Sequence, residues 1–246
     1  MDTTNLNTNA VSTVLNSIEV TNEESFSSPY YDYTNNDLKE QIGSFYQAQN
    51  RAVTERDYEA LIYAAPKSVS SIRRLRVVKD KKSLKNNLNI YVLGSDSSDR
   101  FMNVTYATKE NLKNYLNNYR VMTDTINILD AKVINLGINY EIIVDPNYDP
   151  YDVLNNTKEF LVEQLSEKMQ IGEHFTKNKV YKILRSMKGL LDVTNIEIVN
   201  NSSMGYSDVL FDVDANTTDD NRTIICPLNC VFEIKYPTSD IKGPIK

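Results

Sequence analysis

The stretch RAVTERDYEALIYAAP, residues 51–66, marks the point where a polar N-terminal lead gives way to periodic sequence that can pack. Thr54 can cap a helix here, because its hydroxyl can accept a hydrogen bond from an amide of the first turn. Glu55 and Asp57 place negative charge at the positive end of the helix dipole. Pro66 ends the pattern. Apolar side chains recur at helical spacing, at Tyr58, Leu61, Ile62 and Ala65.

Two strand patterns follow this helix, at residues 69–78 and 88–93. The linker between them, KDKKSLKNN, is polar and charged, which predicts a hairpin turn or loop. A second helix is expected to start at a Thr108 cap, and a short strand at 126–129 closes this part of the chain. The apolar stripe of that helix consists of Leu112, Tyr115, Leu116 and Tyr119.

The clearest strand pattern spans residues 131–144. Its two faces alternate, one apolar and one mostly polar, as in an antiparallel sheet that is covered on one side only. A turn with two prolines at 145–150 ends the strand. Two helices and two strands are predicted after it, at residues 151–169, 176–187, 191–199 and 229–236. Gly189 is expected to end the second of these helices.

These patterns predict an α+β fold of two small units of antiparallel sheet, each with helices packed on one face, preceded by an extended N-terminal arm. The predicted divisions are 1–50 for the arm, 51–130 for the first unit and 131–246 for the second. The arm ends in a short amphipathic helix at 37–48, with Leu38, Ile42 and Phe45 on one face. Residues 1–36 are polar, and two interpretations stay open: a loose terminus, or an arm that docks on a neighbouring subunit.

Composition excludes several classes of protein. The chain has 246 residues, a net charge of -6, 41% hydrophobic residues and two cysteines. The charge argues against a surface devoted to nucleic acid, and two cysteines cannot form a disulfide framework. No apolar run approaches the length of a membrane span. The first fifteen residues lack the basic and apolar regions of a secretory signal.

One basic block stands out, because residues 67–85 hold eight basic residues and one acidic residue, Asp80. It could be a docking face for an acidic partner or a phosphate backbone. It could equally be a solvated strand edge, since Lys and Arg blunt such edges. No aromatic residue is interleaved, which disfavours a single-strand nucleic-acid site. With Lys67 set aside, the interface candidates are Arg73, Arg74, Arg76, Lys79, Lys81, Lys82 and Lys85.

Three other motifs favour structural interpretations. The segment 212–221 resembles a calcium loop, but it carries Thr217 where glycine is required and lacks the final glutamate. Cys226 and Cys230 have no second ligand pair, which zinc needs. His174 is the only histidine and is expected to be a loop residue. Phosphate-binding glycine loops, nucleophile elbows and H-E-x-x-H motifs are absent. We therefore predict no enzymatic activity, no metal and no cofactor.

The helix motif, together with SVSSIRRLRVV (68–78) and LNIYVLGS (88–95), resembles the baseplate wedge proteins of contractile-tailed bacteriophages, the baseplate-J-like family. The resemblance covers roughly residues 40–200, and its specific part is the Arg-Ala-Val-Thr-x-x-Asp-Tyr-Glu helix. The matching positions are Arg51, Thr54, Asp57 and Tyr58, which the resemblance implies are structural. Arg51 and Asp57 could instead form a local ion pair. Family members are usually longer at the N-terminus, which implies a C-terminal portion or a short member.

The resemblance implies a structural protein without chemistry. Its partners would be other copies of itself and other wedge subunits, assembled in the host cytoplasm into a ring around the hub of the virion's tail baseplate. Rearrangement of that ring would trigger sheath contraction. The alternative hypothesis is a stand-alone α+β binding module that docks an acidic partner through the basic strand-turn-strand segment.

Overall fold

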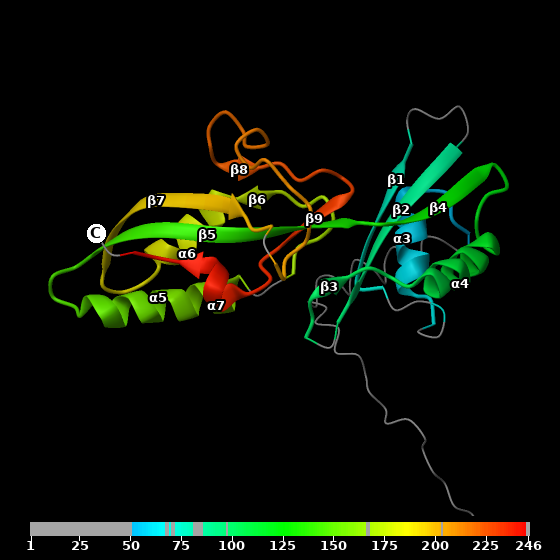
Figure 1. Cartoon of the computed structure of the whole chain (residues 1–246). Helices are drawn as coiled ribbons and strands as arrows, with labels where there is room; N and C mark the ends of the chain where they lie inside the picture. The colour runs from blue at the N-terminus through cyan, green and yellow to red at the C-terminus, as the bar shows by residue number, and fades with distance from the viewer. Residues whose placement is uncertain are drawn as a thin grey trace, which may run out of the picture. The chain divides into compact units, whose positions relative to one another are not determined.

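The computed structural model describes residues 51–66, 69, 72–80, 86–96, 98–165, 168–202 and 204–244, and element labels are those of Figure 1. All of them belong to one compact unit, Asn35–Lys246. The predicted arm and its helix at 37–48 lie outside the described residues. So do Lys67, Lys81, Lys82 and Lys85 of the basic block.

We call the helix in the RAVTERDYEALIYAAP stretch the motif helix. The strands that follow it in the chain form the first sheet. Its elements are α3 (Glu55–Tyr63), β1 (Arg74–Lys79), β2 (Asn86–Ser95), β3 (Phe101–Met102), α4 (Tyr106–Asn117) and β4 (Asp124–Asp130). β1 pairs antiparallel with β2, as the hairpin pattern predicts, with Val77 opposite Ile90. β4 pairs with the other side of β2 in parallel, with Ile128 opposite Ile90. The helices α3 and α4 share one apolar core with this sheet, because Leu61 and Leu112 belong to the same buried cluster as Ile90.

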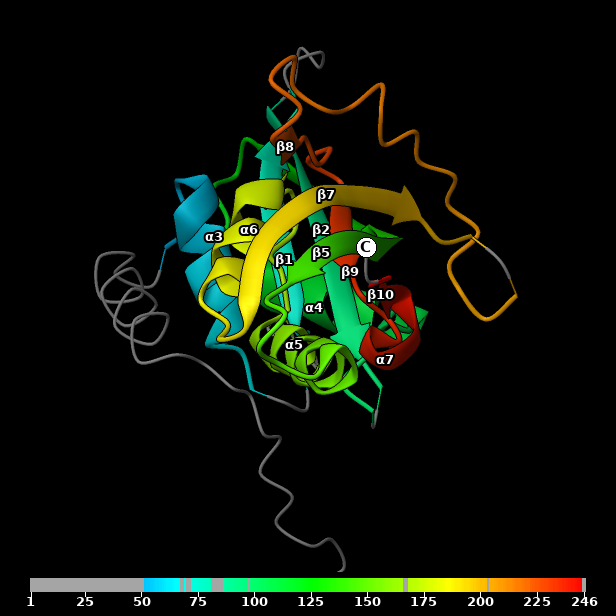
Figure 2. The ribbon, with the colours of Figure 1, turned by 90° about the vertical axis from the view of Figure 1, so that its left-hand side faces the viewer.

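The second sheet is organised around β5 (Lys132–Val144). The remaining elements are α5 (Pro150–Gln164), β6 (Phe175–Thr176), α6 (Lys177–Arg185), β7 (Leu190–Asn200), β8 (Thr223–Ile224), β9 (Cys230–Glu233), α7 (Pro237–Asp240) and β10 (Ile241–Lys242). β5 pairs antiparallel with β7 and in parallel with β9 and β10. Leu161 of α5 and Leu184 of α6 are buried against Ile138 and Phe232. Figure 2 shows β7 and β5 from the end, with α5 beside them.

β4 and β5 are separated by Ala131 alone, so one extended run of chain serves both sheets (Figure 1). The amide of Ala131 donates to Val92 O at 3.2 Å, and the amide of Lys132 donates to Asn229 O at 2.9 Å. The pairing therefore passes from β2 to β9 within two residues. A small buried cluster of Leu93, Ala131, Ile171 and Val231 lies at this crossing.

The α+β class is confirmed, whereas the prediction of purely antiparallel sheets is wrong. Both four-stranded sheets are mixed, because α4 returns the chain to β2 in the same direction and β9 comes back beside β5 after a long connection. Parallel neighbours need such crossover connections, and the alternation of apolar residues does not reveal them. The division at residue 130 stays a prediction.

Several element boundaries also differ from the predictions. The cap of α4 is Thr105, whose side chain accepts from the amide of Thr108. α5 ends at Gln164, which leaves Met169 in a non-helical segment. β1 begins only at Arg74, and β9 covers four residues of the predicted 229–236 strand. Gly189 lies in a turn at φ 83°, beyond the Ser186 cap of α6.

Candidate functional site

The motif helix begins with a reciprocal cap. The Thr54 side chain accepts from the amide of Asp57 at 3.2 Å, and the Asp57 carboxylate accepts from the amide of Thr54 at 2.8 Å. The amide of Val53 also donates to Asp57, at 3.1 Å. This capping box satisfies amides that the first turn would otherwise leave unpaired. The Asp57 carboxylate therefore accepts hydrogen bonds from backbone amides. Among the described contacts it forms no ion pair with the exposed Arg51.

Tyr58 ties the motif helix to the start of β4. Its side chain is fully buried, and its hydroxyl donates to Asp124 Oδ2 at 2.9 Å. Burial first, and then the Asp124 carboxylate, raise the pKa of Tyr58. Just before the helix, the amide of Ala52 donates to Tyr119 O at 2.9 Å. The Ala-x-Thr-x-x-Asp-Tyr spacing thus specifies a joint between the entering chain, α3 and β4.

Replacing Asp57 by Ala is expected to lower the free energy of unfolding by about 0.5–2 kcal/mol, the usual cost of removing a helix cap. Equilibrium unfolding in urea measures this loss. Arg56→Ala is the matched control, because Arg56 is the exposed neighbour in the same helical turn. Equal losses for both variants would show that the cap adds nothing.

The outer edge of β1 is blocked by side chains of α3. The amides of Leu75, Val77 and Lys79 donate to Tyr63 Oη (3.3 Å), Glu59 Oε1 (3.1 Å) and Glu55 Oε1 (2.9 Å). Burial raises the pKa of the Glu59 carboxyl. These are alternate residues of one strand, so the helix takes the positions that another strand would use. An edge covered in this way cannot pair with a neighbouring chain.

The arginines at and just before the start of β1 point largely into the protein. Arg73 is 5% exposed and Arg74 is 8% exposed. Arg74 donates to Lys168 O at 3.1 Å and to Met169 O at 3.4 Å. Arg76 donates to Ile171 O at 2.9 Å. These guanidinium groups hold the segment after α5, so Arg73 and Arg74 do not form the exposed docking face that the charge pattern suggested. Lys79 is exposed, and its docking role stays a prediction.

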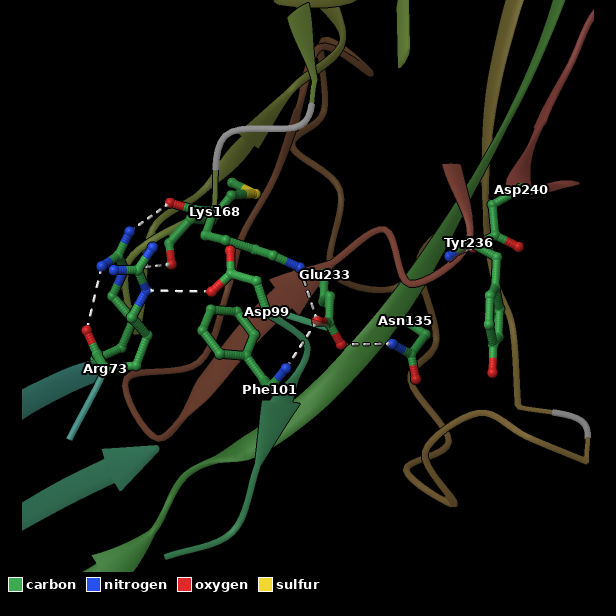
Figure 3. Close-up of polar contacts among 10 residues, drawn as sticks. Arg73, Asp99, Phe101, Asn135, Lys168, Glu233, Tyr236 and Asp240 are labelled. Atoms are coloured by element: carbon green, nitrogen blue, oxygen red, sulfur yellow. Dashed lines mark hydrogen bonds and ion pairs between the residues drawn. The ribbon is translucent and has the colours of Figure 1, made fainter. Parts of the chain in front are cut away.

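Glu233, at the end of β9, lies at the centre of a polar junction (Figure 3). Its side chain is 1% exposed. Oε1 accepts from the amide of Phe101 and from Lys168 Nζ, both at 3.0 Å. Oε2 accepts from Asn135 Nδ2 at 3.3 Å. One buried carboxylate thus joins β3, β5, β9 and the segment that the arginines hold.

Glu233 is not among the residues that the sequence motifs predict to be functional. The one available signal is a single acidic residue inside the apolar run CVFEI, at 230–234. A buried charge of this kind needs both a counter-charge and hydrogen-bond donors. Its three donors come from positions far apart in the sequence, and no spacing rule connects them.

A cavity of about 450 Å³ lies beside this junction, and its wall includes three carboxylates, Asp99, Glu173 and Glu233. Each is already engaged. Asp99 lies 3.5 Å from Arg73 Nε, and Glu173 accepts from the amide of Gln170 at 2.7 Å. His174 also lines the cavity, and its Nδ1 accepts from the amide of Cys226 at 3.0 Å. The titratable side chains in the cavity wall therefore bond to the fold and are not arranged as a paired acid and base.

Cys226 and Cys230 are both buried free thiols. Burial raises the pKa of the Cys226 thiol to about 12 from its ordinary 9.0, and burial also raises the pKa of Cys230. The thiolate is the reactive form, so neither thiol is activated in the folded protein.

Both thiols are expected to resist alkylation by iodoacetamide at pH 8 until the chain unfolds. The folded state keeps the Cys226 proton up to pH about 12, whereas the unfolded thiol loses it near 9.0. The stabilisation from this group is thus fully present below pH 9 and is lost as the pH rises towards 12. Mass spectrometry of alkylated protein over a urea series measures the protection. Modification of the folded chain at the rate of a free thiol would contradict it.

The segment 212–221 forms a polar loop with hydrogen bonds of its own and contacts to Lys177 and Ile225 outside it. Asp212 Oδ1 accepts from the amide of Ala215 at 3.0 Å, and Asp212 O accepts from Asn216 Nδ2 at 2.7 Å. In the described part of the chain, no three His, Cys, Asp or Glu side chains gather as metal ligands would. None of the described helices is both long enough and apolar enough to cross a membrane.

No protein-family model matches the chain, and no curated protein matches it either. Among solved structures, the chain is similar to one from the anti-feeding prophage baseplate, determined by cryo-EM with six-fold symmetry imposed. The TM-score is 0.46 at 11% sequence identity, and the match covers 68% of this chain and 38% of that chain. A likeness at this level carries no argument for function, and this chain matches well under half of the other chain's length.

Proposed function

We propose that this protein is a structural component of a contractile-tail baseplate wedge, which assembles with further copies of itself and with other wedge subunits. The observation that carries the proposal is the motif that bears the family resemblance. Thr54, Asp57 and Tyr58 are used for capping and for joining α3 to β4. Residues of a catalytic motif would face a cavity, whereas these hold the fold together.

The polar junction supports the same proposal. In some proteins, buried charges between distant elements fix one arrangement of the chain and add little net stability. Arg74, Arg76, Lys168 and Glu233 make such contacts in this chain. A subunit that must present the same surfaces to several neighbours benefits from a fixed arrangement of its elements.

The alternative hypothesis, a stand-alone module that binds an acidic partner, loses part of its basis. Two of its three arginines are buried, and Arg76 donates to a backbone carbonyl. Of the seven candidate residues, the described part of the chain leaves Lys79 exposed. Docking through Lys79 and its neighbours in the linker stays a proposal, second to the baseplate role.

The proposal is tested in particles from the organism that encodes the chain. An epitope tag on the chain should appear in purified contractile particles, and immunogold labelling should place it at the end of the sheath that meets the target cell. Particles made without the chain should have unsheathed or unattached tubes. If the chain is absent from particles that are complete and contract normally, the proposed function is wrong.

A further inference from the structure

Two positively charged side chains in the wall of the cavity of about 450 Å³ have no acidic partner. Arg100 lies in the loop between β2 and β3, Lys235 follows β9, and both are half-buried. Among the interactions of the described residues, neither side chain forms an ion pair. Each lies over the ring of Tyr236, with Arg100 Cζ 4.7 Å and Lys235 Nζ 5.9 Å from the ring centroid. Two positive charges therefore share one aromatic ring.

This arrangement leaves positive charge uncompensated. A cation is attracted to the face of an aromatic ring, but two cations held this close repel each other, more strongly where they are partly removed from water. Asp240, the nearest acidic residue along the chain, is buried and accepts from the amide of Tyr236 at 2.8 Å, from Asn201 Nδ2 at 3.1 Å and from the Tyr206 hydroxyl. An anion that enters the cavity would relieve the repulsion.

The other charged groups of the cavity wall already have partners. The carboxylates of Asp99, Glu173 and Glu233 accept from the groups described above. Lys168 is the partner of Glu233, and Lys179 has an interaction partner as well. The charge that a ligand could neutralise therefore belongs to Arg100 and Lys235.

The interior of the cavity is apolar. Leu136, Leu165, Phe175 and Phe232 line it, and all four belong to the buried core cluster of the second sheet. Pockets of about 300–1,000 Å³ with an apolar lining and a few polar groups are typical sites for small organic ligands. An apolar interior beside two unpaired cations selects a ligand with an anionic head and an apolar tail.

We propose that this cavity binds a small amphipathic carboxylate, with its head between Arg100 and Lys235 and its tail against Leu165 and Phe232. Guanidinium and ammonium groups both donate charged hydrogen bonds to a carboxylate. Burial of the tail stabilises the complex in proportion to the apolar area removed from water. This inference does not depend on the proposed function, because the site needs no neighbouring subunit.

Isothermal titration calorimetry of the full chain with octanoate tests the proposal. Octanoate should bind at one saturable site. Acetate, which lacks the tail, and octylammonium, which has the opposite charge, should each bind at least about ten times more weakly, since a charged hydrogen bond or a buried tail contributes that factor or more.

Variants locate the site. Arg100→Gln combined with Lys235→Gln should weaken octanoate binding by at least about tenfold. The same double variant should unfold in urea as the original chain does, because neither residue has an ion pair to lose. Arg185→Gln is the matched control, since Arg185 Cζ also lies over a tyrosine ring, 6.0 Å from the Tyr181 centroid, but does not line the cavity. It should leave octanoate binding unchanged.

Three results would overturn the proposal: no saturable binding of octanoate, equal affinity for octylammonium, or unchanged affinity in the double variant. The single variants Arg100→Gln and Lys235→Gln should each weaken binding by a smaller factor, which keeps the test decisive if the double variant does not fold. Saturable binding that the double variant loses and Arg185→Gln retains supports the site.

Discussion

Replacing Glu233 by Ala is expected to lower the free energy of unfolding by about 3–5 kcal/mol, because it leaves one half of a buried ion pair unmatched. Lys168 would keep its ammonium group at 18% side-chain exposure without its carboxylate. The amide of Phe101 and the Asn135 side chain would lose their acceptor as well. Equilibrium unfolding in urea, followed by circular dichroism, gives the loss directly. Glu197→Ala, at an exposed carboxylate on β7, is the control.

A double variant separates the loss of the ion pair from the cost of leaving one buried charge without a partner. Lys168→Met with Glu233→Leu removes both charges together and fills the same space with apolar atoms. Because a removed pair leaves no unmatched charge, the double variant should be more stable than either Lys168→Met or Glu233→Leu alone. If the losses of the two single changes simply add, Lys168 and Glu233 do not act as a pair.

Arg74→Glu is expected to reduce stability by more than about 3 kcal/mol, since it buries a charge with no partner. The new carboxylate would face Lys168 O and Met169 O, which now accept from the Arg74 guanidinium. The same reversal at Lys79, exposed at the end of the same strand, should change the free energy of unfolding by less than about 0.5 kcal/mol. Thermal and urea unfolding of the two variants measures the contrast.

This pair of variants also tests the basic block as a docking face. If Arg74 served a partner, its reversal would abolish binding and leave folding intact. A cooperative loss of folded structure in Arg74→Glu, with Lys79→Glu unaffected, would assign the arginine to the interior. An Arg74→Glu chain as stable as the original would contradict the buried contacts.

Local sequence patterns predict the features of the fold that depend only on residues close together in the chain. The Thr54 cap, the apolar stripe of α3 and the alternation along β5 follow from hydrogen-bond supply and side-chain period. The structure has the cap and the apolar stripe, whereas the burial of β5 alternates only from Ile138 to Ile142, because residues 134–138 are all buried. The cap of α4 was displaced from Thr108 to Thr105 because both hydroxyls occur within one turn and bond each other at 2.9 Å. Sequence spacing does not distinguish two such neighbours.

The junction could not be predicted, because its parts meet only through the tertiary fold. Asn135 and Glu233 lie on β5 and β9, which pair in parallel only after the long connection between them, and Phe101 lies on β3, which pairs with β2. The burial of Arg73 and Arg74 depends on where the segment after α5 returns. A run of arginines is solvated or buried according to whether carbonyl oxygens come within reach, and local sequence does not contain that information.

The uninterrupted run from Asp124 to Val144 has a mechanical consequence. At the usual rise of a strand its contour is about 70 Å. Its ladders with β2, β7 and β9 lie along the same direction, so a pull on the two ends of the run loads their hydrogen bonds together, in shear. Resistance to such a pull grows with the number of bonds loaded at once. The run can therefore carry tension from one sheet to the other, and the hydrogen bonds of neither sheet need to break one after another.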